Sequence, residues 1–313
     1  MLILHLKLYT TLKDIKLLIA VVLVAIVWGT TFLGIRVAVE TIPGWFVAGI
    51  RQFLAGIIML ILLLFRKELK WIGWKNFSYQ AIIATMMLIF ANGMTTVAEE
   101  SLTSSLASLI SASTPILVFI GSLILGLQRF TIKGLLGIIL CISGILFIFW
   151  DGLKEFAHPE YRTGILLMFG AICGFASGTL FSKKIKLNSD NITLNLFYQF
   201  LYAGIVQIGL AFIFSEEINI ENWSIKSLGA ILYLTIFGSV ITFYAFHYAL
   251  SKISPTQVSI LSYINTIIAI LLGWLVLNEE ITMKFLIAAC LIITGVFITN
   301  YNPALFKKKQ IIA

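Results

Sequence analysis

The chain has 313 residues, of which 60% are hydrophobic and 12% are charged, with a net charge of +8 and a mean hydropathy of +1.02. Soluble domains carry about 25% charged and about 45–50% apolar residues, so this composition excludes a water-soluble fold. The Lys and Arg residues are spread over the ends of the apolar runs, the short gaps between them and the two termini. This distribution does not indicate a nucleic-acid partner.

Ten apolar runs follow one another along the chain, each long enough for a helix to cross the ~30 Å hydrocarbon core of a bilayer. They cover residues 15–39, 45–65, 77–98, 102–126, 130–150, 162–183, 193–214, 226–250, 253–277 and 282–302. The connections are too short for a soluble domain, and no run alternates as a membrane β-strand does. We therefore predict an all-α polytopic membrane protein of ten transmembrane helices.

The fourth and fifth runs are repeated as the ninth and tenth. Residues 103–146 lie over residues 254–297 without a gap, and Ser111 then falls on Ser262. Internal repeats define the architecture of a chain. We therefore divide the protein into two halves of about 150 residues, with five runs each.

Charge in the loops predicts the orientation. Most Lys and Arg residues, including Arg66, Lys184 and Lys307, fall on one side if the runs cross alternately, and Lys/Arg-rich short loops stay in the cytoplasm. Both termini are thus expected inside. Five helices per repeat is an odd number, so the second repeat is expected to be inverted. Inverted repeats place a substrate site at their interface near the midplane.

Small and polar residues end both the first and the sixth run. The first carries Trp28 and Thr30 around a glycine, and the sixth carries Ser177 and Thr179 around another. Such patches are compatible with close helix packing and with the lining of a cavity. Their matching positions in the two repeats favour the lining, so we predict that all four bind substrate.

The second and third runs carry the charged and amide candidates. Arg51 lies about six residues inside its run, where it can snorkel to the interface, pair with an acid such as Glu99 or Glu100, gate the protein, or attract an anionic substrate group. We predict a gating or ion-pairing role for Arg51, Glu99 and Glu100, with the two acids at the outer surface. Asn92 and Thr95 precede them and are predicted to bind substrate.

The fourth and ninth runs are the richest in hydroxyl groups. Serines at helical spacing precede Pro115, which removes a backbone donor and is expected to kink the helix. In lipid, a carbonyl freed by such a kink has to find a partner or face water. The residues that we expect to line the cavity here are Ser108, Ser111, Thr114, Ser262, Tyr263 and Asn265.

The eighth run holds Tyr244 and His247, both predicted to bind substrate; His247 is the one histidine within the ten runs. A structural hydrogen bond, substrate contact and a proton relay all remain open for it.

Several kinds of chemistry lack their residues. No Asp or Glu lies in the middle of a run, which disfavours a carboxylate-driven drug/proton antiporter. Nucleotide-binding and hydrolase motifs are absent, and the three cysteines are far apart with no ligand spacing. We predict no enzyme activity, no catalytic residues, no metal and no cofactor.

The order of these motifs resembles the EamA-type ten-helix branch of the drug/metabolite transporter superfamily. The resemblance rests on the run that begins at Trp28, on the segment around Arg51, on the hydroxyl-rich run before Pro115, and on Leu277-Asn-Glu-Glu. It covers residues 17–149 and 163–301 and implies that these are two inverted five-helix repeats around a central cavity. It also implies that the cavity is lined mainly by helices one, three, four, six, eight and nine, and that the protein exports amino acids or related metabolites. Gln128 and Arg129 stand where many members carry Gly-Glu, so a role for that acid does not carry over to the first repeat.

We therefore expect a monomeric inner-membrane permease that exports small metabolites, most simply amino acids or related compounds, by alternating access. Its partners would be a small-molecule substrate and the lipid bilayer, with no nucleic acid. The alternatives are a transporter of sugars or of drugs and other lipophilic compounds, and a non-transporting membrane scaffold.

Overall fold

The computed structural model describes residues 15–127, 159–185, 191–215, 218–259, 261–279 and 283–300, with a few positions between 130 and 147. Within these residues the chain is helical and contains no strand. Eight of the described helices are long and apolar enough to cross a membrane. The fifth predicted run, 130–150, falls largely outside the described residues. The tenth forms a helix whose apolar part, Leu286–Gly295, is shorter than those eight.

The helices follow the predicted runs closely. In chain order they are α2 (Ile15–Ala38), α3 (Gly44–Arg66), α4 (Trp74–Ala84), η1 (Thr85–Gly93), α5 (Met94–Ala98), α6 (Ser104–Ser111), α7 (Thr114–Ile124), α9 (Pro159–Lys184), α10 (Ile192–Phe214), η2 (Ile220–Asn222), α11 (Ile225–Tyr233), η3 (Leu234–Ile241), α12 (Thr242–Lys252), α13 (Pro255–Ser259), α14 (Leu261–Leu277) and α15 (Met283–Asn300). The short segments α4, η1 and α5 together form one span, as do α11, η3 and α12.

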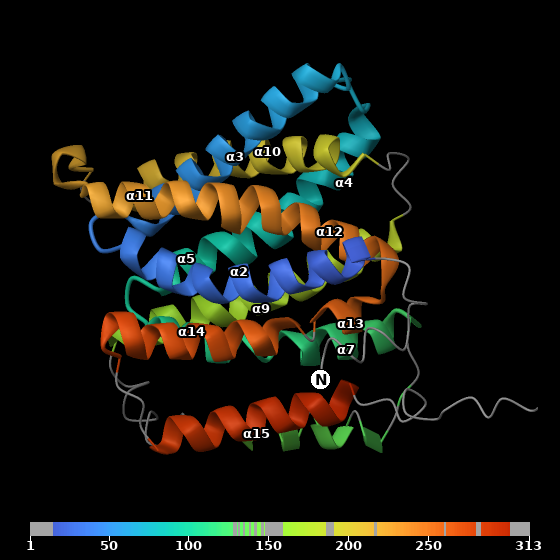
Figure 1. Cartoon of the computed structure of the whole chain (residues 1–313), viewed down its shortest axis with the longest axis vertical. Helices are drawn as coiled ribbons and strands as arrows, with labels where there is room; N and C mark the ends of the chain where they lie inside the picture. The colour runs from blue at the N-terminus through green and yellow to red at the C-terminus, as the bar shows by residue number, and fades with distance from the viewer. Residues whose placement is uncertain are drawn as a thin grey trace, which may run out of the picture.

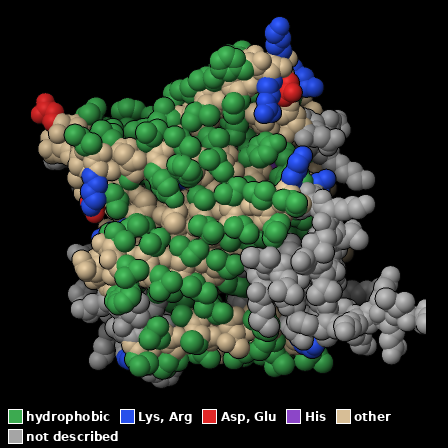
Figure 2. All heavy atoms as spheres, viewed as in Figure 1, with side chains coloured by type: hydrophobic (Ala, Val, Ile, Leu, Met, Phe, Trp, Pro, Cys, Tyr) green, Lys and Arg blue, Asp and Glu red, His purple; other side chains and the backbone are tan. Residues whose placement is uncertain are grey.

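The surface of the bundle is that of a membrane protein. Hydrophobic side chains cover the face shown in Figure 2, and the charged side chains lie at its edges. Large apolar residues such as Phe65, Ile124 and Phe212 are mostly exposed, at 85%, 79% and 64%. Exposure on this scale suits lipid rather than water.

Two spans contain π-helical segments at similar places. Segment η1 interrupts the third span and η3 interrupts the span that runs from Ile225 to Lys252. Both lie near the middle of their spans. Such segments are uncommon and occur frequently at functional sites.

Helices α3 and α10 pack closely and run antiparallel. Gly49 lies against Ile208, where a Cβ would come within 2.7 Å of its Cγ1, and Gly56 lies against Leu201. Residue numbers therefore rise along one helix as they fall along the other. Missing side chains let these two backbones approach closely, as small residues do in membrane helices.

The first helix of each half packs on helices of the other half. Helix α2 contacts α12 and α14, and Figure 1 shows it lying between them. Helix α9 contacts η1, α5 and α7. A glycine, Gly29, permits the approach to α14, since a Cβ there would lie 2.7 Å from the Cβ of Ile268. The core of the molecule thus forms between the halves.

The predicted kink before Pro115 is confirmed. Helix α6 ends at Ser111, two residues turn, and α7 begins at Thr114 with Pro115 in its first turn. Proline is tolerated there because its missing N–H would have no partner in the first turn of a helix.

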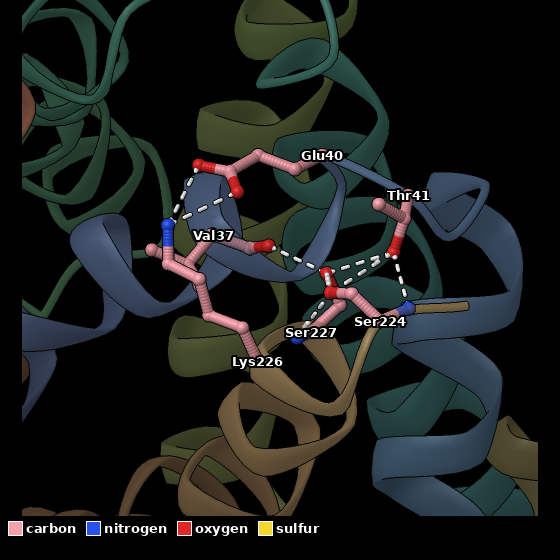
Figure 3. Close-up of polar contacts among 6 residues, drawn as sticks. All are labelled: Val37, Glu40, Thr41, Ser224, Lys226 and Ser227. Atoms are coloured by element: carbon pink, nitrogen blue, oxygen red, sulfur yellow. Dashed lines mark hydrogen bonds and ion pairs between the residues drawn. The ribbon is translucent and has the colours of Figure 1, made fainter. Parts of the chain in front are cut away.

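Polar contacts tie the start of α11 to the end of α2 (Figure 3). The Ser224 side chain caps α11 by accepting from the Ser227 amide, and the Ser227 hydroxyl donates to the Val37 carbonyl at 3.0 Å. Lys226 pairs with Glu40 at 3.1 Å. Both of these charged side chains are well exposed, so the pair contributes little stability.

Candidate functional site

A cavity of about 130 Å³ lies between the two halves of the chain. Its walls come from α2, α3, η1, α5, α6, α7, α9, α12, α13 and α14. Most of the lining is apolar, including Phe32, Ile35, Met87 and Ile172. The polar lining residues are Thr31, Arg51, Asn92, Thr95, Ser111, Thr114, Ser259, Ser262, Asn265 and Thr266. A mainly apolar cavity with a few polar groups is typical of small-molecule sites.

One wall of the cavity is aromatic and centres on Trp28. Its ring packs against Phe175 from α9 at 5.5 Å and against Phe243 and Phe246 from α12 at 5.4 and 5.2 Å between centroids. The indole nitrogen donates to the Gly238 carbonyl at 3.4 Å. Three helices therefore hold a preformed aromatic surface, which suits the apolar part of a ligand.

Hydroxyl groups form another part of the lining, and several of them donate their proton to a backbone carbonyl. Ser262 donates to the Ser259 carbonyl at 2.8 Å, one turn back in the chain. The Thr266 hydroxyl lies 2.9 Å from the Ser108 carbonyl and ties α14 to α6. With its amide turned so that nitrogen faces carbonyls, Asn265 donates to Ala25 and Leu261. These groups present mainly acceptor oxygens to the cavity.

Arg51 occupies a third part of the wall and is 1% exposed. Its Nε donates to the Ser239 hydroxyl in η3 at 2.8 Å. Nη1 is buried without a hydrogen-bond partner among the described residues. Lys226–Glu40 is the one salt bridge in the described part of the chain, so no described acid pairs with Arg51 within 4 Å.

Asn92 is held by its neighbours in a fixed orientation. Gln52 donates to its side-chain oxygen at 3.1 Å, and Thr96 donates to its backbone carbonyl at 2.8 Å. The side-chain nitrogen of Asn92 has no acceptor among the described residues and remains available to a ligand.

Outside the cavity, one end of the bundle is closed by a group of polar contacts that we call the end cluster: Arg36, Gly44, Glu99, Glu100, Ser104, Ser105 and Glu279. The Glu279 carboxylate accepts from the Ser104 amide and hydroxyl, both at 2.8 Å, and from the Ser105 amide at 3.0 Å. The Ser105 hydroxyl also donates to it. A carboxylate in this place suits the positive end of α6.

The rest of the end cluster joins α2, α3 and α5. Arg36 donates to the backbone carbonyls of Glu99 and Glu100, and the Gly44 amide at the start of α3 donates to the Glu100 carboxylate. Glu99 is completely buried, and neither carboxylate oxygen has a hydrogen-bond partner among the described residues. Burial and the nearby Glu279 raise the pKa of the Glu99 carboxyl well above its usual range, against the opposing effect of Arg36 and Arg51.

The structure brings about half of the predicted site residues to the cavity. The predicted substrate-binding residues that line it, joined there by Arg51, are Trp28, Asn92, Thr95, Ser111, Thr114, Ser262 and Asn265. They come from both halves of the chain. Glu99 and Glu100, for which a gating or ion-pairing role is predicted, lie in the end cluster, and the Glu99 side chain is buried there.

The other predicted residues lie away from the cavity. Thr30 bonds to the Val27 carbonyl and to the Tyr233 hydroxyl, and Ser108 bonds to the Ser105 carbonyl. Thr179 and Tyr263 are buried, whereas Ser177 and Tyr244 are exposed on the surface of the bundle. His247 packs edge-on against Phe246, and its Nε2 is buried without a partner in the described residues.

Several lining residues are not among the residues that we predict to bind substrate. Thr31 lies one position beyond the predicted Thr30, because a run of hydroxyls does not say which side of the helix faces inward. Ser259 and Thr266 follow the helical spacing around Ser262, and this signal is sufficient to find them. Phe175 had no signal, since an aromatic residue in an apolar run suits lipid equally well.

Comparison with known proteins agrees with this architecture. The model of the EamA-like transporter family matches residues 15–150 and 162–301. The chain is 28% identical to the uncharacterized inner membrane transporter YedA of Escherichia coli K12 over 92% of both chains. It is 24% identical to the uncharacterized transporter YoaV of Bacillus subtilis over 92% of this chain and 98% of that one.

The fold also has a counterpart among solved structures. A protein crystal structure superimposes with a TM-score of 0.67 and 16% identity, and the match covers 90% of this chain and 96% of that one. At this level of identity the likeness concerns the fold alone.

Proposed function

The chain belongs to the EamA-like transporter family, and from this premise we propose that it is a permease that exports small polar or amphipathic metabolites, such as amino acids, across the inner membrane. It is a multi-pass membrane protein, as its apolar helices and its relatives' names indicate. The observation that carries the proposal is the cavity between the two halves, with one aromatic wall and one polar wall.

Alternating access requires two ways of opening one site, which inverted repeats supply. Two features support such a relation here. The second helix of each half, α3 and α10, packs antiparallel against its counterpart, and each half carries a π-helical segment in its third span. We propose that the end cluster is the outer gate, which closes the cavity when Glu279 caps α6.

The substrate class follows from the lining in part. Aromatic and aliphatic side chains suit an apolar body, while Arg51 and Asn92 suit a polar head. Sugars need many paired donors and acceptors, and this cavity is mainly apolar. A lipophilic cation is disfavoured because no carboxylate is among the lining residues.

A metabolite efflux screen tests the proposal. Cells with and without the protein are compared by mass spectrometry of the medium, and we expect at least one small metabolite to accumulate outside only when the protein is present. Ser111→Trp places a bulky ring in the cavity and should abolish the efflux. Ser177→Trp adds the same ring on the exposed surface and should leave it unchanged.

The control separates transport from a scaffold function. No difference in any metabolite, with the protein present in the membrane at normal level, contradicts the proposed function. Efflux that Ser111→Trp leaves intact contradicts the assignment of the cavity.

A further inference from the structure

Arg51 is a buried cation that its surroundings hold but do not neutralise. Among the described residues no carboxylate lies within 4 Å of it, and the carboxylate of Glu99, the acid whose charge acts on it, makes no hydrogen bond with a described residue. Burying a charge without a paired opposite charge is costly. A side chain kept in this state next to a cavity therefore points to an anionic ligand.

The guanidinium group is oriented before any ligand arrives. Ser239 accepts from Nε at 2.8 Å, and Thr235, one turn earlier in η3, approaches the Arg51 carbonyl at 3.4 Å. Gly238 leaves room for the group, since a Cβ there would lie 2.9 Å from Nη2. Neither terminal nitrogen donates to a described residue, so both remain available for an acceptor.

The groups that share this wall can complete a site for an acidic group. Asn92 lines the cavity with a side-chain nitrogen that has no described acceptor, and Thr95 lies one turn further along the same span. The Trp28 ring and its phenylalanine neighbours face the same cavity. A ligand with an acidic end and an apolar body matches this arrangement.

We propose that Arg51 binds a carboxylate of the transported metabolite through its two terminal nitrogens, and that the substrates are therefore organic acids or zwitterions rather than neutral or cationic compounds. This inference rests on the proposed function and narrows it. Guanidinium and carboxylate match in geometry, and the pair is strong where water is excluded. Ser239 positions the guanidinium group for it.

A rival explanation assigns Arg51 to the gate. In another conformation Arg51 would pair with Glu99, and its loss would then affect every substrate equally. Glu99→Gln would reproduce that loss. The two explanations therefore differ in selectivity, which is measurable.

The test is a thermal-shift titration of the purified full-length protein in detergent. A ligand that binds the folded state raises Tm by mass action. The probes are the standard L-amino acids, lactate and succinate, each compared with its own primary amide, and the amino acids also with their decarboxylated amines. We expect one or more acids to bind at least about tenfold more tightly than the matching amide and amine.

Variants of the protein test whether Arg51 causes the preference for acids over amides and amines. Arg51→Gln should reduce the affinity for the acid to that for the matching amide. Arg51→Lys keeps the positive charge but loses the paired donors of the guanidinium group, so it should retain part of the preference for the acid. Glu99→Gln should keep the preference. Arg66→Gln removes the same charge from the exposed end of the same helix and serves as the control.

Three results overturn the proposal: no acid binds, acids and amides bind the wild type equally, or Arg51→Gln weakens acids and amides in proportion. The comparison of acids with their amides on the wild-type protein tests the proposal even if Arg51→Gln fails to fold. Failure of the proposed function is separate, because it is the absence of any efflux in the metabolite screen. Efflux confined to neutral or basic metabolites overturns the inference alone.

Discussion

Among the described residues, Arg51 and Glu99 are the two charged side chains that are fully buried, at 1% and 0% exposure. They lie in different places, one on the cavity wall and one in the end cluster. Neither makes a salt bridge with a described residue. Burying an ionisable group without a charged partner is costly, so such groups concentrate where a protein uses them. At the scale of single residues, these two side chains are therefore the main evidence for function.

The buried carboxyl of Glu99 predicts a pH dependence of stability. Because its pKa is raised in the folded state, the folded protein holds this proton more tightly than the unfolded chain. The stability from Glu99 is thus fully present below the pKa of the unfolded chain and is lost as pH rises through the raised pKa. Glu99→Gln does not titrate, so we expect its Tm to fall less steeply with rising pH.

This expectation is checked by thermal unfolding of the purified protein in detergent from acidic to neutral pH. Glu221→Gln, at an exposed carboxyl, is the control and should follow the wild type. Equal slopes for the wild type and Glu99→Gln would show that Glu99 does not titrate differently on folding.

His247 gives a second prediction at this scale. Its Nε2 is buried without a partner in the described residues, and the side chain does not line the cavity. His247→Phe removes an unsatisfied polar atom and keeps an aromatic ring at this position, so we expect the free energy of unfolding to stay within about 1 kcal/mol of the wild type or to rise, with efflux retained. Loss of efflux at unchanged Tm would return His247 to the substrate-contact or proton-relay role.

Thr266 is expected to behave differently from His247, because its polar atom has a hydrogen-bond partner. Its hydroxyl joins α14 to α6, so Thr266→Val should lower the free energy of unfolding by roughly 0.6–1.7 kcal/mol, the range for interhelical hydrogen bonds in membranes. Thermal unfolding of the two variants side by side measures the difference. A Thr266→Val protein as stable as the wild type would mean that this contact contributes nothing.

The sequence predicts which face of a helix is polar better than it predicts how deeply a side chain is buried. Hydroxyls at helical spacing pointed to Ser111, Ser262 and Asn265, which line the cavity. The position of Arg51 along its run allowed snorkelling to the interface, and only the neighbouring η3 segment, with Ser239, keeps it inside. That contact joins residues far apart in the chain, so no local pattern encodes it.

At the scale of elements, hydropathy predicts the extent of the eight described spans closely. The run 45–65 became α3, Gly44–Arg66, and the run 193–214 became α10, Ile192–Phe214. Proline chemistry predicted the break before α7. The π-helical segments η1 and η3 had no signal, because a change of hydrogen-bond register within a helix leaves its apolar content unchanged.

Packing of α3 on α10 predicts a matched pair of glycine variants on one helix. A Cβ at Gly204 would lie 2.5 Å from the Phe53 backbone nitrogen, whereas at Gly209 nothing lies within 4 Å. Gly204→Ala should therefore destabilise the protein by about 1–3 kcal/mol. Gly209→Ala should be neutral or stabilise it by up to about 1 kcal/mol, since alanine favours helix.

Thermal unfolding in detergent checks both variants. Equal Tm values for Gly204→Ala and Gly209→Ala would contradict the close antiparallel packing of α3 and α10.

At the scale of the whole molecule, the charge distribution predicts an orientation that the helices alone do not fix. Single cysteines are introduced into a background without the three native ones and labelled with an impermeant thiol reagent. A cysteine at Lys184 should react only from the cytoplasmic side and one at Glu221, beyond α10, only from outside. The opposite pattern would contradict the predicted orientation.

The end cluster connects helices that line the cavity at one end of the bundle. Glu279 accepts hydrogen bonds from the start of α6, and both α6 and α14 line the cavity, so we expect movement of this contact to change access to the site. The central claim is that the cavity opens alternately to the two sides, with this cluster as the outer gate. A reversible lock on the cluster therefore addresses the claim most directly.

That measurement uses Ser105→Cys with Glu279→Cys in the cysteine-free background, bridged by a short reducible bis-thiosulfonate reagent. Efflux of a metabolite found in the screen is followed in proteoliposomes before bridging, after bridging and after reduction. We predict that efflux stops when the bridge forms and returns when it is reduced, while the reagent leaves the efflux rate of each single-cysteine variant unchanged. Undiminished efflux from protein that mass spectrometry shows to be fully cross-linked would contradict alternating access through this gate.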